Sequence, residues 1–498
     1  MRLVTSFGRC AAAVSLAVVV AAHVGSPDVY FAGMAGPYAI DVAIRPPKVV
    51  PGIAQVNVHV RDSSVSRVVV RPVFWRAGTK GAPTGDDAKP IPGRPGSFTG
   101  ELWLMATGSY SVNVTVSGRA GTGTAVVPVV SVATGQLALS PLLRWLLGIL
   151  GTLLVAGVIT AIHAAAGEAQ VDAGEAVPAE RKRKARIATI IAVPVLAFVV
   201  FGGANWWNDE AMRYTRTLYR PVQTKTTIAD VEGVPTLTIS VLDTGWRQGR
   251  VAPLMPDHGK LAHLFIARAD SPYVFAHLHP DMPDQSTLVA ALPPLPFGKY
   301  RVYTDVVHET GFQRTLTDSF TLKTSLDKRG LIKLSADDAW SADVASRVER
   351  SMPLSRHGDS LFIGWKGNIH PGVNETNVLQ FSLWERDGKP AIVEPYLGMY
   401  GHAVVIKDDG SVFIHLHPSG TSAMASQEAF AIRDRGDTTR EGRLKLDAAP
   451  MSGMATPTHM SEISFPYAFP SAGRYRVWVQ VRVAGVVHTS GYDVTVVP

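Results

Sequence analysis

Two apolar runs in the middle of the chain constrain the fold more than any other feature. They read "WLLGILGTLLVAGVITAI" at residues 145–162 and "IATIIAVPVLAFVVFGG" at residues 187–203. Each run is close to the minimum length that crosses a hydrocarbon layer about 30 Å thick. Tryptophans stand at the outer ends of both runs, where interfacial aromatic residues are expected. We therefore predict transmembrane helices at 141–163 and 187–207.

Charges around these runs predict the orientation of the chain. The segment between them, 164–186, carries the basic cluster "RKRKAR" at 181–186. An excess of Lys and Arg marks the cytoplasmic side of a membrane, so we expect a cytoplasmic loop here. Residues 1–22 resemble a secretory signal peptide, because Arg2 and Arg9 precede an apolar run that ends in small residues. Both signals place the protein in the cytoplasmic membrane of a bacterium, with both large regions facing the periplasm or the outside.

Composition and motifs exclude several classes of function. Cys10 is the only cysteine and would leave with the signal peptide, so the mature chain has no disulfide and no thiolate. The net charge of +7 comes without a basic stripe interleaved with aromatics, so nucleic acid is not an expected partner. The sequence contains no P-loop, dinucleotide fingerprint, nucleophile elbow or H-E-x-x-H motif, and we predict a protein that is not an enzyme. A three-histidine zinc hydrolase is the enzymatic alternative, but no glutamate at a usable spacing offers a general base.

Outside the predicted membrane spans, short alternating strands recur at intervals of about 8 to 12 residues, as in β-sandwiches. They form three segments, 30–138, 222–325 and 357–498, with a polar linker at 326–356 and a short juxtamembrane helix at 205–219. A related motif opens the penultimate strand of each segment: "GSYSV", "GKYRV" and "GRYRV". Its tyrosine resembles the corner tyrosine of immunoglobulin-like domains. The predicted fold class is mainly β, with three immunoglobulin-like β-sandwiches plus a two-helix transmembrane hairpin.

The tetrapeptide HLHP occurs once in each of the last two segments. Each copy has a histidine 13 or 14 residues upstream of its first HLHP histidine, and the predicted metal ligands are His263, His277, His279, His402, His415 and His417. Residues i and i+2 of a strand point to one face about 6.6 Å apart, so each HLH pair can converge on one ion. The proline then ends the strand, and a tight connection would fold the upstream histidine back beside the pair. We therefore predict three imidazoles together in each sandwich.

Methionines lie near the same segments. Met399 precedes His402 by three residues, and Met424 follows His417 by seven. A loop in the third segment, "APMSGMATPTHMSE", adds three methionines and a histidine at 451–460. Thioether and imidazole without thiolate form a ligand set that suits copper better than calcium or magnesium. Met399 and Met424 therefore join the predicted metal ligands, and copper is the predicted cofactor.

Structural interpretations compete with this one. A lone H-x-H on a strand is more often structural than ligating, and methionines in a loop are often packing residues. His258 and His308 give a weaker signal still, because a surface histidine needs no special reason. The recurrence of HLHP with an upstream histidine and a nearby methionine favours metal binding. The alternative for the repeat is a duplicated fold whose histidines only bond a turn.

Two longer stretches around the HLHP motifs resemble a known group of domains. "PDHGKLAHLFIARADSPYVFAHLHP" and "EPYLGMYGHAVVIKDDGSVFIHLHP" look like the histidine-bearing core of the YtkA-like or FixH-like bacterial secreted domains, often likened to CopC-type copper carriers. The resemblance covers 232–323 and 358–498, and the six HLHP-associated histidines match it. It implies an immunoglobulin-like sandwich outside the cytoplasm with copper handling. The first segment shares only the general shape, and His59 is its sole histidine.

Together these patterns predict a membrane-anchored extracytoplasmic metal-binding protein that buffers, senses or delivers copper. Its partners would be the membrane, through two spans, and an envelope protein or a copper donor or acceptor. The alternative is a non-enzymatic envelope interaction or structural protein with architectural histidines.

Overall fold

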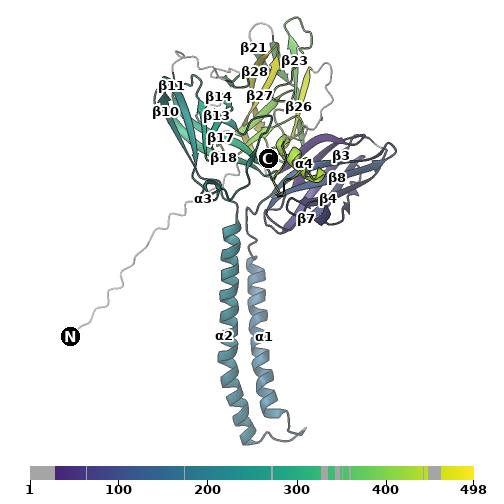
Figure 1. Cartoon of the computed structure of the whole chain (residues 1–498). Coiled ribbons are helices and arrows are strands. Elements are labelled where there is room, and N and C mark those ends of the chain that lie inside the picture. Colours follow the sequence, from purple (N-terminus) through teal and green to yellow (C-terminus); the bar gives the residue numbers. More distant parts are fainter. Residues whose placement is uncertain are drawn as a thin grey trace, which may run out of the picture.

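The computed structural model describes residues 28–62, 64–172, 174–270, 273–326, 335–341, 348–349, 352–357, 361–440, 442–446 and 461–498, with only the backbone strands over 348–357. The fold is mainly β, with antiparallel sheets in three sandwiches and two long apolar helices, which confirms the predicted fold class. Figure 1 shows the sandwiches gathered at one end of the helix pair. The predicted signal peptide and the methionine-rich loop at 451–460 lie outside the described residues.

The N-terminal sandwich consists of two sheets. Its elements are β1 (Val29–Ala35), β2 (Tyr38–Arg45), β3 (Gly52–Val60), β4 (Val65–Phe74), a 3-10 turn η1 (Thr79–Gly81), β5 (Asp86–Asp87), β6 (Lys89–Pro90), β7 (Ser97–Leu104), β8 (Gly108–Gly118) and β9 (Gly121–Ser131). The strand orders are β1-β2-β3-β7-β6 and β5-β4-β8-β9. Every second residue of β2 is buried, because alternate side chains of a strand point to the same face. The buried rows of both sheets meet in one core.

Two helices, α1 (Pro141–Glu168) and α2 (Ala179–Thr217), are each long and apolar enough to cross a membrane. They pack against each other, where the ring of His163 lies 3.0 Å from the hydroxyl of Thr189. Most of their large apolar side chains are exposed, which requires an apolar surrounding such as lipid. Both helices are longer than predicted. The basic cluster at 181–186 lies on the first turns of α2, and the predicted juxtamembrane helix continues α2 without a break.

The second sandwich follows α2. Its elements are β10 (Thr224–Val231), β11 (Val234–Val241), α3 (Thr244–Arg247), β12 (Leu254–Met255), β13 (His263–Arg268), β14 (Phe275–Leu278), β15 (Asp281–Asp284), β16 (Thr287–Ala291), β17 (Gly298–His308), β18 (Gln313–Leu322) and β19 (Ala339–Ser341). One sheet has the order β10-β11-β16-β15. The other has the order β12-β17-β13-β14-β19, with β18 also paired to β17. Strand β19 lies within the predicted linker at 326–356, part of which therefore completes this sheet.

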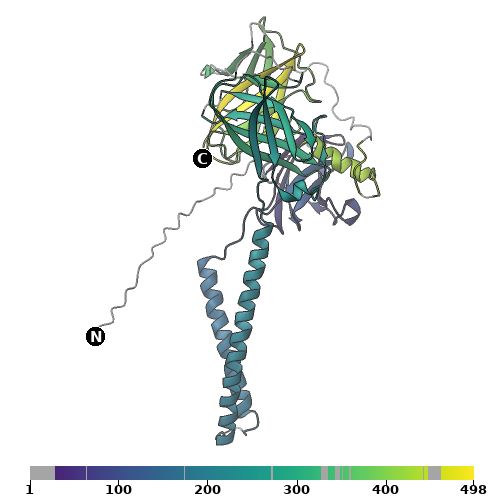
Figure 2. The ribbon, with the colours of Figure 1, turned by 60° about the vertical axis from the view of Figure 1, so that its left-hand side comes forward.

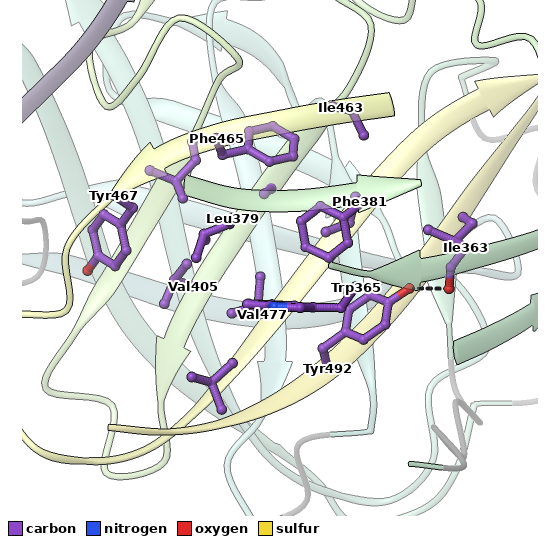
Figure 3. Packing of buried hydrophobic residues seen from close by; sticks show 14 of the residues in the cluster. Ile363, Trp365, Leu379, Phe381, Val405, Ile463, Phe465, Tyr467, Val477 and Tyr492 are labelled. Atoms are coloured by element: carbon purple, nitrogen blue, oxygen red, sulfur yellow. Dashed lines mark hydrogen bonds between the residues drawn. The ribbon is translucent and has the colours of Figure 1, made fainter. Parts of the chain in front are cut away.

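The third sandwich repeats this arrangement. Its elements are β20 (Val348–Glu349), β21 (Met352–His357), β22 (Leu361–Trp365), β23 (Asn377–Glu385), β24 (His402–Lys407), β25 (Phe413–Leu416), α4 (Met424–Arg435), β26 (Glu462–Tyr467), β27 (Gly473–Val483) and β28 (Val486–Val496). The order β25-β24-β27-β28 matches β14-β13-β17-β18 of the second sandwich. Its core is rich in aromatic rings, and Figure 3 shows the buried hydroxyl of Tyr492 donating to the carbonyl of Ile363, 2.7 Å away. Helix α4 was not predicted; it follows the HLHP segment and ends at Gly436, which has a left-handed φ of 81°.

The repeated tyrosine occupies equivalent positions in the last two sandwiches. The hydroxyl of Tyr300 donates to the carbonyl of Pro296 (2.6 Å), and that of Tyr475 donates to the carbonyl of Ser471 (2.8 Å). Both bonds reach back four residues, as in the tyrosine corner of immunoglobulin-like domains. The prediction that Tyr300 and Tyr475 occupy equivalent corners is confirmed.

The second and third sandwiches pack face to face through the sheets that carry HLHP (Figure 2). In β13, Leu264 and Ile266 enter the core of their own sandwich, whereas Phe265 and Ala267 point to the other sandwich. The third sandwich alternates in the same way. Aromatic rings fill the middle of this interface, and their members are Phe265, Phe275, Tyr303, Phe413 and Trp478. Since both faces of β13, β14, β24 and β25 are buried, their fully buried positions are apolar except where the histidines lie.

The N-terminal sandwich contacts the third sandwich at the loop that follows HLHP. The backbone N–H of Ala32 donates to the carbonyl of Ser419 (2.9 Å), and that of Thr421 donates to the carbonyl of Tyr30 (2.9 Å). A side chain on Gly420 would collide with the backbone of Tyr30, so this close approach requires glycine. The ring of Tyr30 is part of the core of the third sandwich. Strand β1 therefore holds the loop 418–422 in place.

Candidate metal centre

The strands place the predicted histidines on the interface between the second and third sandwiches. His263 is the first residue of β13. His277 lies in β14, where it is the cross-strand partner of Phe265. His402 opens β24, and His415 lies in β25 opposite Val404. The leucine of each HLHP points into the core of its own sandwich, so the flanking histidines share the opposite face. The alternation H-L-H therefore serves two neighbouring packing layers.

The two copies meet in one cluster of imidazoles. The ring centroids of His263 and His415 are 5.5 Å apart, those of His277 and His415 are 5.8 Å apart, and those of His277 and His402 are 6.3 Å apart. All of these rings are almost fully buried. Sequence spacing predicted two separate sites, one in each sandwich. The structure instead joins them across the domain interface.

The first group consists of His263, His277 and His279, as predicted, with one ring nitrogen of each within 4.8 Å of the others. Nε2 of His263 lies 3.1 Å from the backbone carbonyl of Asp257, so it must carry the proton, because a carbonyl only accepts. Nδ1 of His279 likewise donates to the carboxylate of Asp338 (2.8 Å). Nδ1 of His277 faces the amide oxygen of Gln480 at 2.8 Å.

These outer hydrogen bonds fix which nitrogen of each ring keeps a lone pair. With protons on the outer nitrogens, the lone pairs are on Nδ1 of His263 and on Nε2 of His277 and His279. The first two of these atoms face each other at 3.2 Å. Two lone pairs at that distance repel each other unless a proton or a cation lies between them. Hydrogen bonds of this kind to the non-ligating nitrogen are typical of metal-binding histidines.

The second group consists of His258, His402 and His417, again with one nitrogen of each within 4.8 Å of the others. Nε2 of His258 lies 3.3 Å from Nε2 of His417. His258 belongs to the second sandwich and the other two residues belong to the third. The predicted grouping of His402 with both HLHP histidines is therefore only partly right, because His258 completes this group and His415 does not.

A tight turn carries His258 into the third sandwich. His258 and Gly259 have φ angles of 54° and 77°, and Leu397 and Gly398 have 50° and 71° at the equivalent turn of the other copy. A side chain on Gly398 would lie 3.7 Å from Nδ1 of His258, so the two turns abut. Sequence reasoning set His258 aside as a surface histidine. Aligning the two copies would have placed it in a turn that precedes the first histidine of the motif.

His415 lies between the two groups and pairs with a carboxylate. Its Nδ1 is 3.6 Å from the Oδ2 atom of Asp305, which lies on β17 of the other sandwich. Gln480 has the equivalent place on β27 and contacts His277. Burial raises the pKa of Asp305 from 3.8 to about 7.

Burial governs the protonation of the histidines. It lowers the pKa of His263 to about 3 and that of His417 to about 4. Burial, followed by the repulsion of neighbouring imidazoles, also holds the pKa of His277, His402 and His415 well below the ordinary value. These five rings are therefore neutral at physiological pH, which is the form that binds metals.

Several buried ring nitrogens of the cluster have no hydrogen-bond partner within the described part of the chain. They include both nitrogens of His402, Nε2 of His279 and Nε2 of His415. An unsatisfied buried polar atom costs about 1 to 3 kcal/mol, so such atoms gathered in one place require an explanation. A metal ion that accepts their lone pairs supplies one, and the donor set of neutral imidazoles fits copper, zinc or nickel.

Acidic residues lie beside both groups. Asp338 precedes β19, in the predicted linker, and accepts bonds from both the backbone N–H and the ring of His279. A carboxylate oxygen of Asp257 lies 3.7 Å from Nε2 of His258. Asp257 is adjacent to its histidine in sequence, whereas Asp338 lies 59 residues beyond His279 and gave no local signal.

The predicted methionine ligands have a different environment. Met399 is buried in the turn before β24, one residue after Gly398. Met424 is the first residue of α4 and is partly buried. His308 is buried against Trp246 and Phe312, away from the imidazole cluster. The ligation of metal by either methionine stays a prediction.

Comparisons with known proteins give little functional information. No curated protein matches the sequence. A family model described as a domain of unknown function (DUF8832) matches residues 357–498, which contain the third sandwich.

Several solved structures resemble the chain weakly. Native alpha-2-macroglobulin of Escherichia coli is 9% identical over 94% of this chain and 23% of its own, with a TM-score of 0.19. A putative membrane anchored protein from Corynebacterium diphtheriae is 9% identical over 94% of both chains, with a TM-score of 0.15. The D1–D4 ectodomain fragment of ICAM-5 is 8% identical over 93% of this chain and 77% of its own, with a TM-score of 0.14. This chain spans about a quarter of the length of the alpha-2-macroglobulin.

Proposed function

We propose that this protein binds copper ions in the buried imidazole cluster between its second and third sandwiches. The observation that carries the proposal is the pair of three-histidine groups, each with its nitrogens within 4.8 Å. Imidazole ligands suit several divalent metals, and copper binds most tightly to a given nitrogen site in the Irving–Williams order. The resemblance of both HLHP stretches to copper-carrier domains favours the same metal.

The surroundings of the cluster favour binding over catalysis. The cavity that touches His263 and His417 has a volume of about 10 Å³, close to the space that one water molecule needs. An ion fits such a space, whereas an organic substrate does not. We therefore propose a buffering, sensing or delivery role without chemistry on a substrate.

The two apolar helices support the proposed placement of the protein in a membrane. With α1 and α2 in the cytoplasmic membrane, all three sandwiches lie on one side of it, because they share one end of the hairpin (Figure 1). The basic residues at 181–186 lie at the opposite end, on α2. The positive-inside rule then places the sandwiches outside the cytoplasm.

Metal content tests the proposal directly. The full chain, purified in detergent and loaded with copper or zinc, is analysed by elemental mass spectrometry beside two double variants, H263A/H277A and H402A/H417A. We expect the wild type to hold copper, and each double variant to lose the ion of its own group. The control is His308→Ala, which removes a buried histidine that packs against Trp246 and Phe312 instead of other imidazoles. A wild type that holds no metal, or only zinc, would sink the copper proposal.

The competing function is a purely architectural interface. The stacked aromatic rings between the sandwiches and the hydrogen bonds of His277 and His279 favour it. If it holds, the melting temperature of the protein is the same with copper and with a copper chelator. Metal binding instead raises it, because an ion that binds only the folded state stabilises that state.

A further inference from the structure

Two cavities share one wall beside the imidazole cluster. The outer cavity has a volume of about 140 Å³ and lies between the three sandwiches, with Val130 on one side and Thr421 on another. The inner cavity has a volume of about 10 Å³ and touches His263 and His417 of the two histidine groups. Asp305, Gln313 and His415 line both cavities. These three residues therefore form the partition between the outer cavity and the cluster.

The partition carries free ligand atoms. His415 is 3% exposed, and its Nε2 has no hydrogen-bond partner within the described residues. Its Nδ1 lies 3.6 Å from Oδ2 of Asp305, which is too long for a hydrogen bond. The other carboxylate oxygen of Asp305 accepts a bond from the hydroxyl of Thr315 (2.5 Å). A buried carboxylate beside an imidazole that belongs to neither group is a ligand pair for a cation.

The equivalent place in the other copy is different. There Gln480 replaces the carboxylate, contacts His277 at 2.8 Å and donates to the hydroxyl of Thr489. A neutral amide holds its imidazole in one orientation and attracts no cation. Of these two equivalent positions, only the one at the partition carries a carboxyl group, and it lies on the side of the outer cavity.

We propose that Asp305 and His415 form a transfer site through which a copper ion passes between the outer cavity and the two histidine groups. This inference rests on the proposed function. The outer cavity also touches Thr134 and Tyr219, which flank the two long helices. Ions would therefore enter or leave near the membrane-facing side of the three sandwiches.

Loading kinetics test the transfer site. Metal-free full chain in detergent is mixed with Cu(II) held by a weak glycine buffer, and the rate of loading and the final copper content are both measured. We expect Asp305→Asn to slow loading by at least about tenfold, because it removes the charge that attracts the ion, and to leave the final content unchanged. A lower final content at an unchanged rate would make Asp305 a ligand of a resident ion and overturn the transfer role.

A second variant blocks the outer cavity without touching a charged group. Val130 lies on β9 of the N-terminal sandwich and is half-buried, so Val130→Trp fills part of the cavity. We expect slower loading and the same final content. The matched control is Val126→Trp, four residues earlier on the same strand and also half-buried, which does not line the cavity. If both variants at 130 and 305 load as fast as the wild type, the passage is refuted, and if the wild type itself takes up no copper, the proposed function falls first.

Discussion

The second and third sandwiches carry the same motif on the same strands, yet their histidines are completed by different parts of the molecule. The first group is closed from within the second sandwich by Asp338 and the segment 335–341, and Gln480 of the third sandwich contacts it from outside. The second group needs His258 of the neighbouring sandwich, and its loop 418–422 is held by the N-terminal sandwich. Duplicated motifs therefore need not give duplicated sites. The packing around them decides what each site contains.

The largest expected effect comes from breaking the interface that both groups share. Phe413 stacks on Tyr303 with ring centroids 4.2 Å apart, and its counterpart Phe275 stacks on Trp478 at 4.9 Å. We expect Phe413→Ala and Phe275→Ala each to lower the free energy of unfolding by about 3 to 5 kcal/mol, because each removes a fully buried ring. Urea unfolding of the detergent-solubilised protein measures this. A loss below about 1 kcal/mol for either variant would mean that the interface is not well packed.

The next prediction distinguishes the two histidine groups by their copper affinities. His258→Leu makes the turn of the second sandwich resemble that of the third, where Leu397 has the same left-handed φ. We expect copper affinity of the second group to fall by at least about a hundredfold, while the first group keeps its ion. Titration with a competing chelator resolves the two affinities. His59→Leu, on an exposed strand position of the N-terminal sandwich, is the control. Equal weakening of both groups would show that the cluster binds as one unit.

Lowering the pH tests the burial of the neutral histidines in the metal-free protein. The imidazoles titrate near 6.5 in the unfolded chain, whereas burial lowers the pKa of His263 to about 3 and that of His417 to about 4. Between these values the unfolded chain binds more protons, so the free energy of unfolding falls as pH drops below 6.5. The slope is about 1.4 kcal/mol per pH unit for each such histidine. Denaturant titrations at pH 7 and pH 5 test it, and equal stability at both would contradict burial of neutral rings.

The buried carboxyl group of Asp305 has the opposite effect on the pH dependence of stability. Burial raises its pKa from 3.8 to about 7, so the folded state binds the extra proton between these values. Its contribution to stability is present below 3.8 and is lost as pH rises toward 7. Asp305→Asn should therefore stabilise the metal-free protein at pH 8 by at least about 1 kcal/mol and have little effect at pH 4. Gln480→Ala, at the equivalent position, should show no such pH dependence.

The smallest expected effect concerns the two tyrosine corners. Tyr300→Phe and Tyr475→Phe each remove one hydroxyl that bonds a carbonyl four residues upstream. We expect each to cost about 1 kcal/mol, and the cost at Tyr475 to be slightly greater because its hydroxyl also contacts that of Ser471 (2.9 Å). Thermal unfolding of both variants compares the two corners. A neutral substitution at one corner only would mean that the sandwiches differ there.

Local patterns were sufficient to predict most of the fold. Alternation of apolar residues predicted the strands, and the repeated tyrosine predicted equivalent corners at Tyr300 and Tyr475. Helix α4 was missed because it interrupts a segment that otherwise alternates like a sandwich. Strand β19 was missed because three residues in a polar segment give no periodicity.

The candidate site was less predictable, because its completion is non-local. The spacing within each HLHP copy predicted that His263 would join His277 and His279, since one hairpin brings them together. No local pattern predicts that the HLHP-bearing sheets of the second and third sandwiches pack face to face. The contributions of His258 and Asp305 depend on that packing. The contribution of Asp338 depends on the pairing of β19 with β14, and it lies 59 residues beyond His279. Only the position of His258 within the repeat carried a signal.

The contact between β1 and the loop 418–422 sets an order of biogenesis. The backbone N–H of Tyr30 and the hydroxyl of Thr421 bond over 391 residues of sequence, with α1 and α2 between them. Strand β1 leaves the ribosome early, whereas the loop leaves near the end of synthesis. With both helices in the membrane as we propose, the loop reaches β1 only after the hairpin has been inserted and the last sandwich exported. The proposed copper site around His417 would therefore form late, after export of the last sandwich, so a nascent chain in the cytosol would lack it.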